Sequence, residues 1–366
     1  MKPIDLSKLK TYPLAERKSM ATIEETLIDP ASSAPSLSPP NQEHVTRCAA
    51  DIRAAREAGS SVMYIYGAHL IKNGAHLLLD ELMNGGWITH LATNGAGVIH
   101  DWEWAFHGKS TECVRSNVAT GSFGSWEETG RYLHLALLTG AINNEGFGQS
   151  VGRMANEENL TLPSIAELEN QLREEPAHPL APARAELLQA MTQHELKDGL
   201  HEIPHPWKSS CVLANAIKRK VPLTVHPGIG YDIISNHPMF NGAALGRAAQ
   251  MDFATFGGAV EGLDNGVVLS VGSAIMGPQV FEKSISCVNN LRLQKNRPIV
   301  KDHSFHVIDI QDGGDWDWKQ GEPPKDNPAY YLRFCKSFDR MGGSMHYAQC
   351  DNITFTHHLL NELKTL

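Results

Sequence analysis

Short runs of apolar residues alternate along most of this chain with longer segments whose apolar residues recur at helical spacing. The runs predict buried strands, because a strand that is covered on both faces is apolar throughout. Six such strands are expected, over residues 61–66, 87–93, 221–226, 266–271, 305–310 and 345–348. Helical patterns lie between them, so the strands are joined by parallel crossovers. We therefore expect an α/β fold with a doubly wound, mainly parallel sheet and helices on both faces.

Two segments depart from this rhythm. Residues 1–41 are polar, with a stretch dense in serine and proline at 31–40, and they predict an N-terminal arm. Residues 150–205 carry helical patterns that Pro176, Pro179 and Pro182 interrupt, which indicates an inserted helical region. One α/β domain over residues 42–366 is enough for a single sheet of this size.

The composition narrows the class of protein. Of the 366 residues, 42% are hydrophobic and the formal net charge is −9, which is unlike the basic surface of a nucleic-acid binder. No stretch approaches the roughly 20 apolar residues of a membrane span, and the N-terminus lacks the apolar run of a signal peptide. The six cysteines are scattered without a CxxC pair, which favours reduced core residues. We expect a cytoplasmic protein with no membrane or nucleic-acid partner.

Polar, glycine-rich segments follow nearly every expected strand, at residues 67–74, 93–101, 226–237, 272–278 and 309–318. Because the carboxyl ends of parallel strands meet at one edge of a sheet, these segments predict a ligand site there. Asn94-Gly95-Ala96-Gly97 leads into a helix, whose first N–H groups can hold a phosphate or carboxylate. A tight structural turn is the alternative interpretation.

An acidic and aromatic loop follows the strand expected at 305–310. It contains Asp312, Asp315 and Asp317 with Trp316 and Trp318. Such a loop could bind a cation or stack on a ring, and a plain surface loop is the alternative.

The histidines suggest a different chemistry. His226, Asp232, His237 and His100 could together hold a metal ion, as in a metal-dependent hydrolase or lyase. The residues lack the spacing of a helical metal pair, so this stays one hypothesis among several.

Taken in order, these segments resemble the deoxyhypusine synthase family and its bacterial deoxyhypusine synthase-like relatives. The resemblance is strongest in Ile65-Tyr66-Gly67, in His69-Leu70-Ile71-Lys72-Asn73-Gly74 and in Leu91-Ala92-Thr93-Asn94-Gly95-Ala96-Gly97, and it continues with gaps to about residue 360. It implies a nicotinamide-dinucleotide sheet related in architecture to that of sirtuins, and a homotetramer with sites at subunit interfaces. In that family NAD oxidises spermidine, and a lysine takes up the aminobutyl group as an imine.

The resemblance also implies roles for particular residues. The following would face the NAD cofactor: Ala68, His69, Thr93, Asn94, Gly95, Gly272, Ser273, Asp309, Asp315 and Asp351. The candidate catalytic residues are Lys336, Asp232 and His100. Lys336 matches the reactive lysine of the family, and Asp232 is the one residue left of the acidic residues that surround the family's substrate. His100, together with Ile99, occupies the positions of two adjacent acidic residues in the family. Because several acidic and histidine positions are replaced, we expect a substrate specificity that differs from spermidine.

Lys336 lies among aromatic residues that include Tyr330, Tyr331 and Phe338. Desolvation by these rings would lower the pKa of the lysine and make it a nucleophile. The alternative is a surface lysine whose stem lies across the rings.

The prediction is thus a deoxyhypusine synthase-like, NAD-binding enzyme that performs an aminoalkyl transfer or an NAD-dependent redox reaction on a small amine. Its small-molecule substrate would bind to a homo-oligomer, expected to be a tetramer. Two alternatives stay open. One is a His/Asp metal-dependent hydrolase or lyase, and the other is a catalytically inactive ligand-binding module on the same fold.

Overall fold

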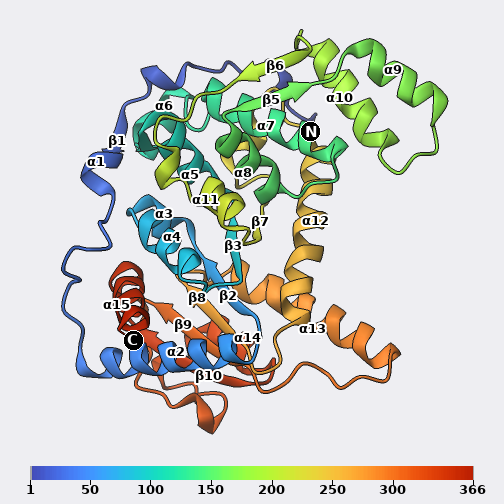
Figure 1. Ribbon diagram of the computed structural model, residues 1–366. Coiled ribbons are helices and arrows are strands. Elements are labelled where there is room, and N and C mark those ends of the chain that lie inside the picture. Colours follow the sequence, from blue (N-terminus) through green and yellow to red (C-terminus); the bar gives the residue numbers. More distant parts are fainter. Residues whose placement is uncertain (1, 366) are drawn as a thin grey trace. The chain divides into compact units, whose positions relative to one another are not determined.

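The computed structural model describes residues 2–365. These residues pack as two compact units (Figure 1). Unit 1 comprises residues 2–26, 98–218 and 227–252, and unit 2 comprises residues 27–97, 219–226 and 253–365. The single domain expected over residues 42–366 stays a prediction, because compact packing does not decide whether the two units unfold together.

Unit 2 is built around the six-stranded sheet that the sequence predicts. Its strands are β2 (Val62–Tyr66), β3 (His90–Asn94), β7 (Leu223–His226), β8 (Val267–Val271), β9 (Ser304–Asp309) and β10 (Ser344–Gln349). They lie in the order β10-β9-β8-β2-β3-β7, and every neighbouring pair is parallel. The predicted α/β fold class with a parallel sheet is therefore confirmed.

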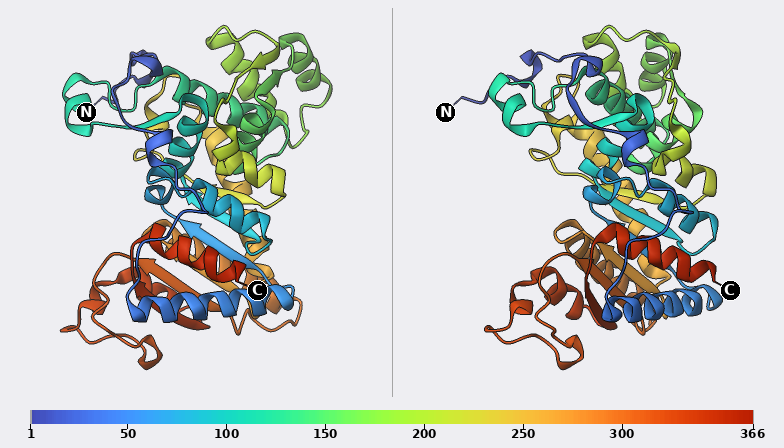
Figure 2. Two further views of the ribbon diagram at one scale, coloured as in Figure 1. Left: turned by 60° about the vertical axis from the view of Figure 1, so that its left-hand side comes forward. Right: turned by 90° about the vertical axis from the view of Figure 1, so that its left-hand side faces the viewer.

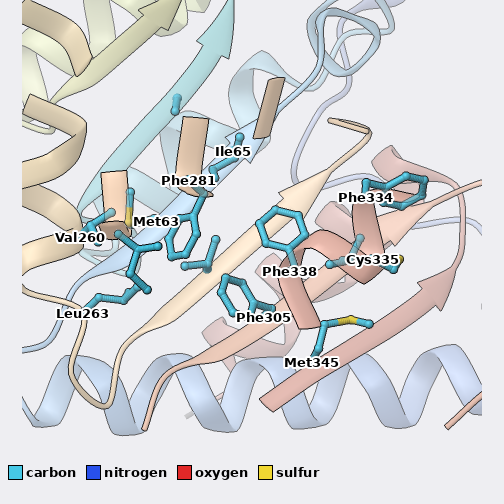
Figure 3. Packing of buried hydrophobic residues seen from close by; sticks show 14 of the residues in the cluster. Met63, Ile65, Val260, Leu263, Phe281, Phe305, Phe334, Cys335, Phe338 and Met345 are labelled. Atoms are coloured by element: carbon cyan, nitrogen blue, oxygen red, sulfur yellow. The ribbon is translucent and has the colours of Figure 1, made fainter. Parts of the chain in front are cut away.

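Helices cover one face of this sheet through an apolar cluster. Successive strand residues point to opposite faces, so Met63 and Ile65 of β2 face the same side. That side packs against α12 (Gly242–Glu261), α13 (Met276–Gln294) and α14 (Arg333–Asp339). In Figure 3 the rings of Phe281, Phe305 and Phe338 lie together in this cluster, with ring centroids 4.9 Å apart for the last pair. The members of this cluster are buried and form the hydrophobic core on this face of the sheet.

The opposite face is covered by α2 (Pro39–Glu57), α4 (His76–Asn84) and α15 (Asn352–Lys364). Figures 1 and 2 show α2 and α15 side by side along the sheet. The hydroxyl groups of Tyr64 on β2 and Thr356 on α15 are 2.6 Å apart and share a hydrogen bond. A short helix, α3 (Ala68–Lys72), and the 3-10 turns η5 (Trp318–Gln320) and η6 (Pro328–Tyr331) complete unit 2.

Unit 1 is mainly helical. Its helices are α1 (Ile23–Thr26), α6 (Val114–Thr120), α7 (Glu127–Ile142), α8 (Phe147–Glu157), α9 (Ile165–Glu174) and α10 (Ala181–Gln193). The helices α5 (Gly95–His107) and α11 (Val212–Arg219) continue from one unit into the other, as α12 does. The 3-10 turns of this unit are η1 (Leu6–Lys8), η2 (Leu14–Glu16), η3 (Lys208–Ser210) and η4 (Ile233–Asn236).

Two small antiparallel sheets belong to unit 1. The strand β1 (Ser19–Thr22) pairs with β4 (Lys109–Glu112), so this part of the segment that the sequence marks as a polar arm belongs to a sheet of the unit. The strand β5 (Asn159–Leu162) pairs with β6 (Gly199–Glu202). The region expected as a helical insertion at 150–205 thus holds α9 and α10 together with two strands that the sequence pattern did not predict.

Two helix starts differ from the sequence-based expectation. The sequence Ser125-Trp126-Glu127-Glu128 predicts a capping box, but α7 has Trp126 at its N-cap and no side-chain cap. The Glu128 carboxylate instead accepts a hydrogen bond from the Leu14 backbone, 2.6 Å away. The helix expected near His100 begins at Gly95, directly after β3.

Among the described residues, no helix has the length and apolar character needed to cross a bilayer.

Candidate functional site

The strand order of unit 2 reverses beside β2. The strands β3 and β7 follow on one side of it, and β8, β9 and β10 follow on the other. Numbered along the chain, the sheet has the order 3-2-1-4-5-6, in which dinucleotides bind beyond the carboxyl ends where the order reverses. The candidate site is therefore the carboxyl edge of this sheet, centred on the ends of β2 and β8.

The loops after β2 and β8 touch through their backbones. A Cβ atom on Gly67 would lie 2.1 Å from the carbonyl oxygen of Gly272. Gly272 itself has a φ of +59°, in the left-handed region that favours glycine, and a Cβ there would lie 2.3 Å from Nδ2 of Asn352. Side chains are thus excluded at both positions, which leaves backbone groups at the point where the strand order reverses.

The other residues expected after β2 and β8 lie beside these glycines. Ala68 and His69 open α3, and the side chain of His69 is exposed. Ser273 is buried, and its hydroxyl accepts a hydrogen bond from the Gly277 N–H at 3.1 Å. Ser273 therefore caps the first turn of α13, in addition to any role toward a ligand.

The end of β3 has a defined geometry. The Thr93 hydroxyl donates to the carbonyl of Tyr66 at 3.1 Å, and Asn94 Oδ1 accepts from the Gly97 N–H at 2.9 Å. Asn94 is thus the N-cap of α5, and Gly95 is the first residue of that helix. The residues Thr93, Asn94 and Gly95 are placed at the carboxyl edge, as the sequence predicts, in a turn fixed by its own hydrogen bonds.

Acidic residues end β9 and follow β10. Asp309 is buried and accepts from the Gln311 N–H at 3.1 Å. Asp351 is the N-cap of α15 and accepts from both the N–H and the hydroxyl of Thr354, each at 2.8 Å. The next residue, Asn352, has a buried Oδ1 with no hydrogen-bond partner among residues 2–365. A buried acceptor without a donor is costly, so Asn352 is a further candidate contact for a ligand.

A pocket of about 280 Å³ opens at the carboxyl ends of β9 and β10. We call it the edge pocket. Its walls come from the start of α2, the loop after β9 and the end of β10, and they include Ser38, Asn41, His44, Asp315, Trp316 and Tyr347.

Two aromatic walls of the edge pocket are held in place. Trp316 donates its ring N–H to the Gly321 carbonyl at 2.9 Å, and the Tyr347 hydroxyl donates to the Gln311 carbonyl at 2.5 Å. Asp315 is exposed and has a φ of 48°. Aromatic side chains held by hydrogen bonds beside an exposed carboxylate suit a flat or cationic group.

Lys336 lies on a different part of unit 2. It is half-buried on α14, with its ammonium nitrogen 3.8 Å from the centroid of the Tyr330 ring. That helix packs on α13 and β10, and three strands separate β10 from β3, which ends at Asn94. The structure does not bring Lys336 together with the Asn94 turn. The contact with Tyr330 matches a surface lysine lying across aromatic rings, and the reactive role stays a prediction.

The other two candidate catalytic residues belong to unit 1. His100 Nδ1 lies 2.7 Å from the Ser110 hydroxyl, which in turn donates to the buried Glu103 at 2.9 Å. Asp232 is buried and accepts from the Gly228 N–H at 2.8 Å, so it closes its own loop. Each residue thus has a structural partner.

The residues of the metal hypothesis are dispersed. His226 ends β7 in unit 2, where its ring lies 3.2 Å from the Thr224 hydroxyl, while Asp232, His237 and His100 belong to unit 1. Within residues 2–365, no three His, Cys, Asp or Glu side chains are grouped so that they could hold a metal ion. The metal-dependent hydrolase or lyase therefore has no donor set in the described chain.

Sequence reasoning missed a buried polar chain between α2 and β9. Asp51 Oδ2 lies 2.8 Å from His306 Nε2, and His306 Nδ1 lies 3.1 Å from His44 Nε2. The sequence gives little signal for this chain of side chains, because His306 is one of several polar residues in β9 and lies 262 positions from His44. Burial, followed by the neighbouring histidines, lowers the pKa of His44 to about 2.

Comparisons with known proteins give distant structural similarities alone. No family model matches this chain. No curated protein matches it either. The apo form of ArgZ, an arginine dihydrolase of cyanobacteria, aligns over 89% of this chain and 33% of its own with 14% identity and a TM-score of 0.40, so the chain spans about a third of ArgZ. A Methanococcus maripaludis S2 protein provisionally described as LOR/SDH aligns over 92% of this chain and 73% of its own, with 16% identity and a TM-score of 0.41.

The expected family is also represented among these neighbours. An Entamoeba histolytica protein provisionally described as a deoxyhypusine synthase aligns over 75% of this chain and 80% of its own, with 9% identity and a TM-score of 0.35. Scores this low do not establish a common fold, so the architecture rests on the strand order described above. Membership of the deoxyhypusine synthase family stays a prediction.

Proposed function

We propose that this chain is an NAD-binding enzyme of the deoxyhypusine synthase-like type, which oxidises a small amine other than spermidine. The observation that carries the proposal is the reversal of strand order at β2, where Gly67 and Gly272 bring two backbone loops into contact. A sheet of this order binds a dinucleotide beyond its carboxyl edge.

The end of β3 supports a place for the dinucleotide. Asn94 Oδ1 satisfies the N–H of Gly97, so the N–H groups of Gly95 and Ala96 in the first turn of α5 are not engaged by this cap. Such groups, together with the helix dipole, favour a phosphate. We place the pyrophosphate or the adjoining ribose near Asn94.

The edge pocket supports an amine as substrate. Asp315 supplies an exposed carboxylate, and Trp316 and Tyr347 supply ring faces. A carboxylate and an aromatic face both attract an ammonium group. Because the Lys336 ammonium lies over the Tyr330 ring, as expected for a surface lysine, we favour NAD-dependent redox chemistry over a transfer through a lysine imine.

Calorimetry with millimolar NAD tests the cofactor. We expect binding to the unmodified chain and a rise in its unfolding temperature, because a ligand that binds only the folded state stabilises it. Gly95→Val should remove the binding, since a β-branched side chain would stand where the phosphate approaches. Gly258→Val is the matched control, because Gly258 is a helix residue with no heavy atom within 4 Å of its Cβ position. An absence of both heat and stabilisation with NAD would remove the proposal.

A screen of small amines for NADH formation tests the reaction. NAD binding without turnover of any amine would favour the second candidate, a catalytically inactive ligand-binding module.

A further inference from the structure

Three side chains form a continuous hydrogen-bonded chain from the surface of α2 to the edge pocket. The Asp51 carboxylate is 2.8 Å from Nε2 of His306, whose side chain is fully buried. Nδ1 of His306 is 3.1 Å from Nε2 of His44, and His44 lines the edge pocket. The chain therefore has a carboxylate at one end and a pocket at the other.

The carboxylate decides which ring nitrogens carry protons. Burial raises the pKa of Asp51, but the hydrogen bond to His306 and the neighbouring histidines outweigh it and lower the pKa, so this group is ionised and accepts hydrogen bonds only. In its neutral form, His306 carries its proton on Nε2, which faces the carboxylate, and its Nδ1 is an acceptor. His44 must donate from Nε2, which leaves the lone pair on its own Nδ1.

His44 is the member of this chain that lines the edge pocket. His44 has 7% of its surface exposed. Its Nδ1 has no hydrogen-bond partner in the part of the chain that the structure describes. Burial holds the pKa of His44 at about 2, so the resting ring is neutral and the assignment of its protons applies.

Other charged groups surround the chain without interrupting it. The His346 ring is stacked on His306, with centroids 5.2 Å apart, and its Nδ1 lies 3.4 Å from Arg47. His346 shares no hydrogen bond with His44 or His306 among those found in residues 2–365. It therefore serves as a comparison residue of the same type in the same cluster.

We propose that His44 accepts a proton from the molecule bound in the edge pocket and that His306 and Asp51 form the relay that makes this possible. The identity of that molecule rests on the proposed function, whereas the relay follows from the geometry of the three side chains. His44 is the catalytic residue, and His306 and Asp51 are positioning residues.

The proton transfer balances without a further reactant. The N–H bond of the bound molecule breaks, its electron pair stays on that atom, and a new bond forms at His44 Nδ1. The proton on His44 Nε2 then moves to His306 Nδ1. His44 ends neutral, and the positive charge rests on His306 beside the Asp51 carboxylate. A neutral, buried imidazole can accept a proton in this way because the charge does not remain on it.

Acylation by diethyl pyrocarbonate tests the open nitrogen without any substrate. The reagent modifies imidazole nitrogens that carry a lone pair, and peptide mass spectrometry locates the products. We expect His44 to be modified in the folded chain, as the exposed His69 is, and faster than the fully buried His76 and His306. Modification of His69 with none at His44 would overturn the relay, because the nitrogen would not be open to the pocket.

Turnover of the amine identified in the NADH screen tests the relay itself. We expect His44→Gln to lower kcat by about 100-fold, the usual scale of general base catalysis, with KM and NAD affinity unchanged. Asp51→Asn keeps an acceptor oxygen but removes the charge, so it should also lower kcat at constant KM. His346→Gln is the control and should retain kcat.

Equal kcat values for His44→Gln and His346→Gln would contradict the relay. If no amine is oxidised, the proposed function fails, while the acylation result still decides whether His44 presents its lone pair to the pocket.

Discussion

At the scale of single residues, the two loops that meet where the strand order reverses require glycine, because glycine has no side chain. Gly67 is needed because a methyl group would meet the backbone oxygen of Gly272, and Gly272 is needed for its positive φ. The sequence marks both positions as glycines after strands but does not reveal that the two loops touch. Their contact is set by the pairing of β2 with β8, which lie about 200 residues apart in the chain.

Gly67→Ala tests this contact. The added methyl group would lie 2.1 Å from a backbone atom, which cannot move aside as a flexible side chain would. We expect a loss of about 1–3 kcal/mol in the free energy of unfolding, measured by urea denaturation. The control is Gly258→Ala, which has open space around its Cβ position and should stabilise its helix by about 0.5–1 kcal/mol. Equal stabilities of the two variants would contradict the close approach.

The buried histidines of unit 2 predict sensitivity to acid. Burial lowers the pKa of His44 to about 2, of His90 to about 3 and of His226 to about 4, from an ordinary value of 6.5. Between those values and about pH 6.5 the unfolded chain binds more protons than the folded chain, so stability falls as the pH falls. Each group contributes up to about 1.4 kcal/mol per pH unit in that window.

Urea midpoints measured from neutral pH down to about pH 4.5 check this slope. The His90→Gln variant has no titrating side chain at position 90. Its stability should therefore fall less steeply as the pH falls, and the difference should equal the contribution of one histidine. A stability that stays constant over this range would contradict the buried, neutral state of these rings.

At the scale of elements, the six strands of the parallel sheet were predictable, whereas the strands of the two small sheets and several helix starts were not. Strands such as β2 and β8 are apolar runs that are buried on both faces, so the local sequence identifies them. The start of α5 at Gly95 does not follow from helix propensity, because glycine disfavours a helix, and it is fixed by the hydrogen bond from the Gly97 N–H to the Asn94 side chain. The capping box predicted for α7 does not form, because Glu128 accepts a hydrogen bond from the backbone of Leu14, which is distant in the sequence.

At Asp351, a role in capping a helix can be distinguished from a role in binding a ligand. As N-cap of α15 it accepts two hydrogen bonds from Thr354, and Asp351→Ala should cost about 0.5–2 kcal/mol of stability by urea denaturation. Asp351→Asn keeps a capping oxygen and should retain most of that stability. If Asp351 also faces NAD, calorimetry of Asp351→Asn should show weaker NAD binding in a stable protein. Unchanged affinity would leave Asp351 as a cap alone.

At the scale of the whole molecule, the fold class followed from the order of strands and helices, whereas the candidate site followed only in part. The residues expected at the carboxyl ends of β2, β3, β8 and β9 are at that edge, because the ends of parallel strands must meet there. His44, His306 and Asp51 escaped prediction because their partners come from α2 and β9, and nothing local in the sequence pairs them.

The homotetramer expected from the family resemblance is the remaining whole-molecule prediction. Leu291 and Leu293 on α13 are 57% and 60% exposed, and Leu291 borders a groove of about 380 Å³ between α12 and α13. Apolar side chains beside a groove are costly in water and mark a contact surface.

We expect light scattering at low micromolar concentration to report about four times the chain mass of 40.2 kDa. Leu291→Glu combined with Leu293→Glu should reduce that mass, because burying carboxylates in a contact is unfavourable. Leu200→Glu is the control, since Leu200 is 62% exposed on β6 and does not line this groove, and it should leave the mass unchanged. A particle of 40.2 kDa in the unmodified protein would remove the prediction and, with it, the expectation of sites shared between subunits.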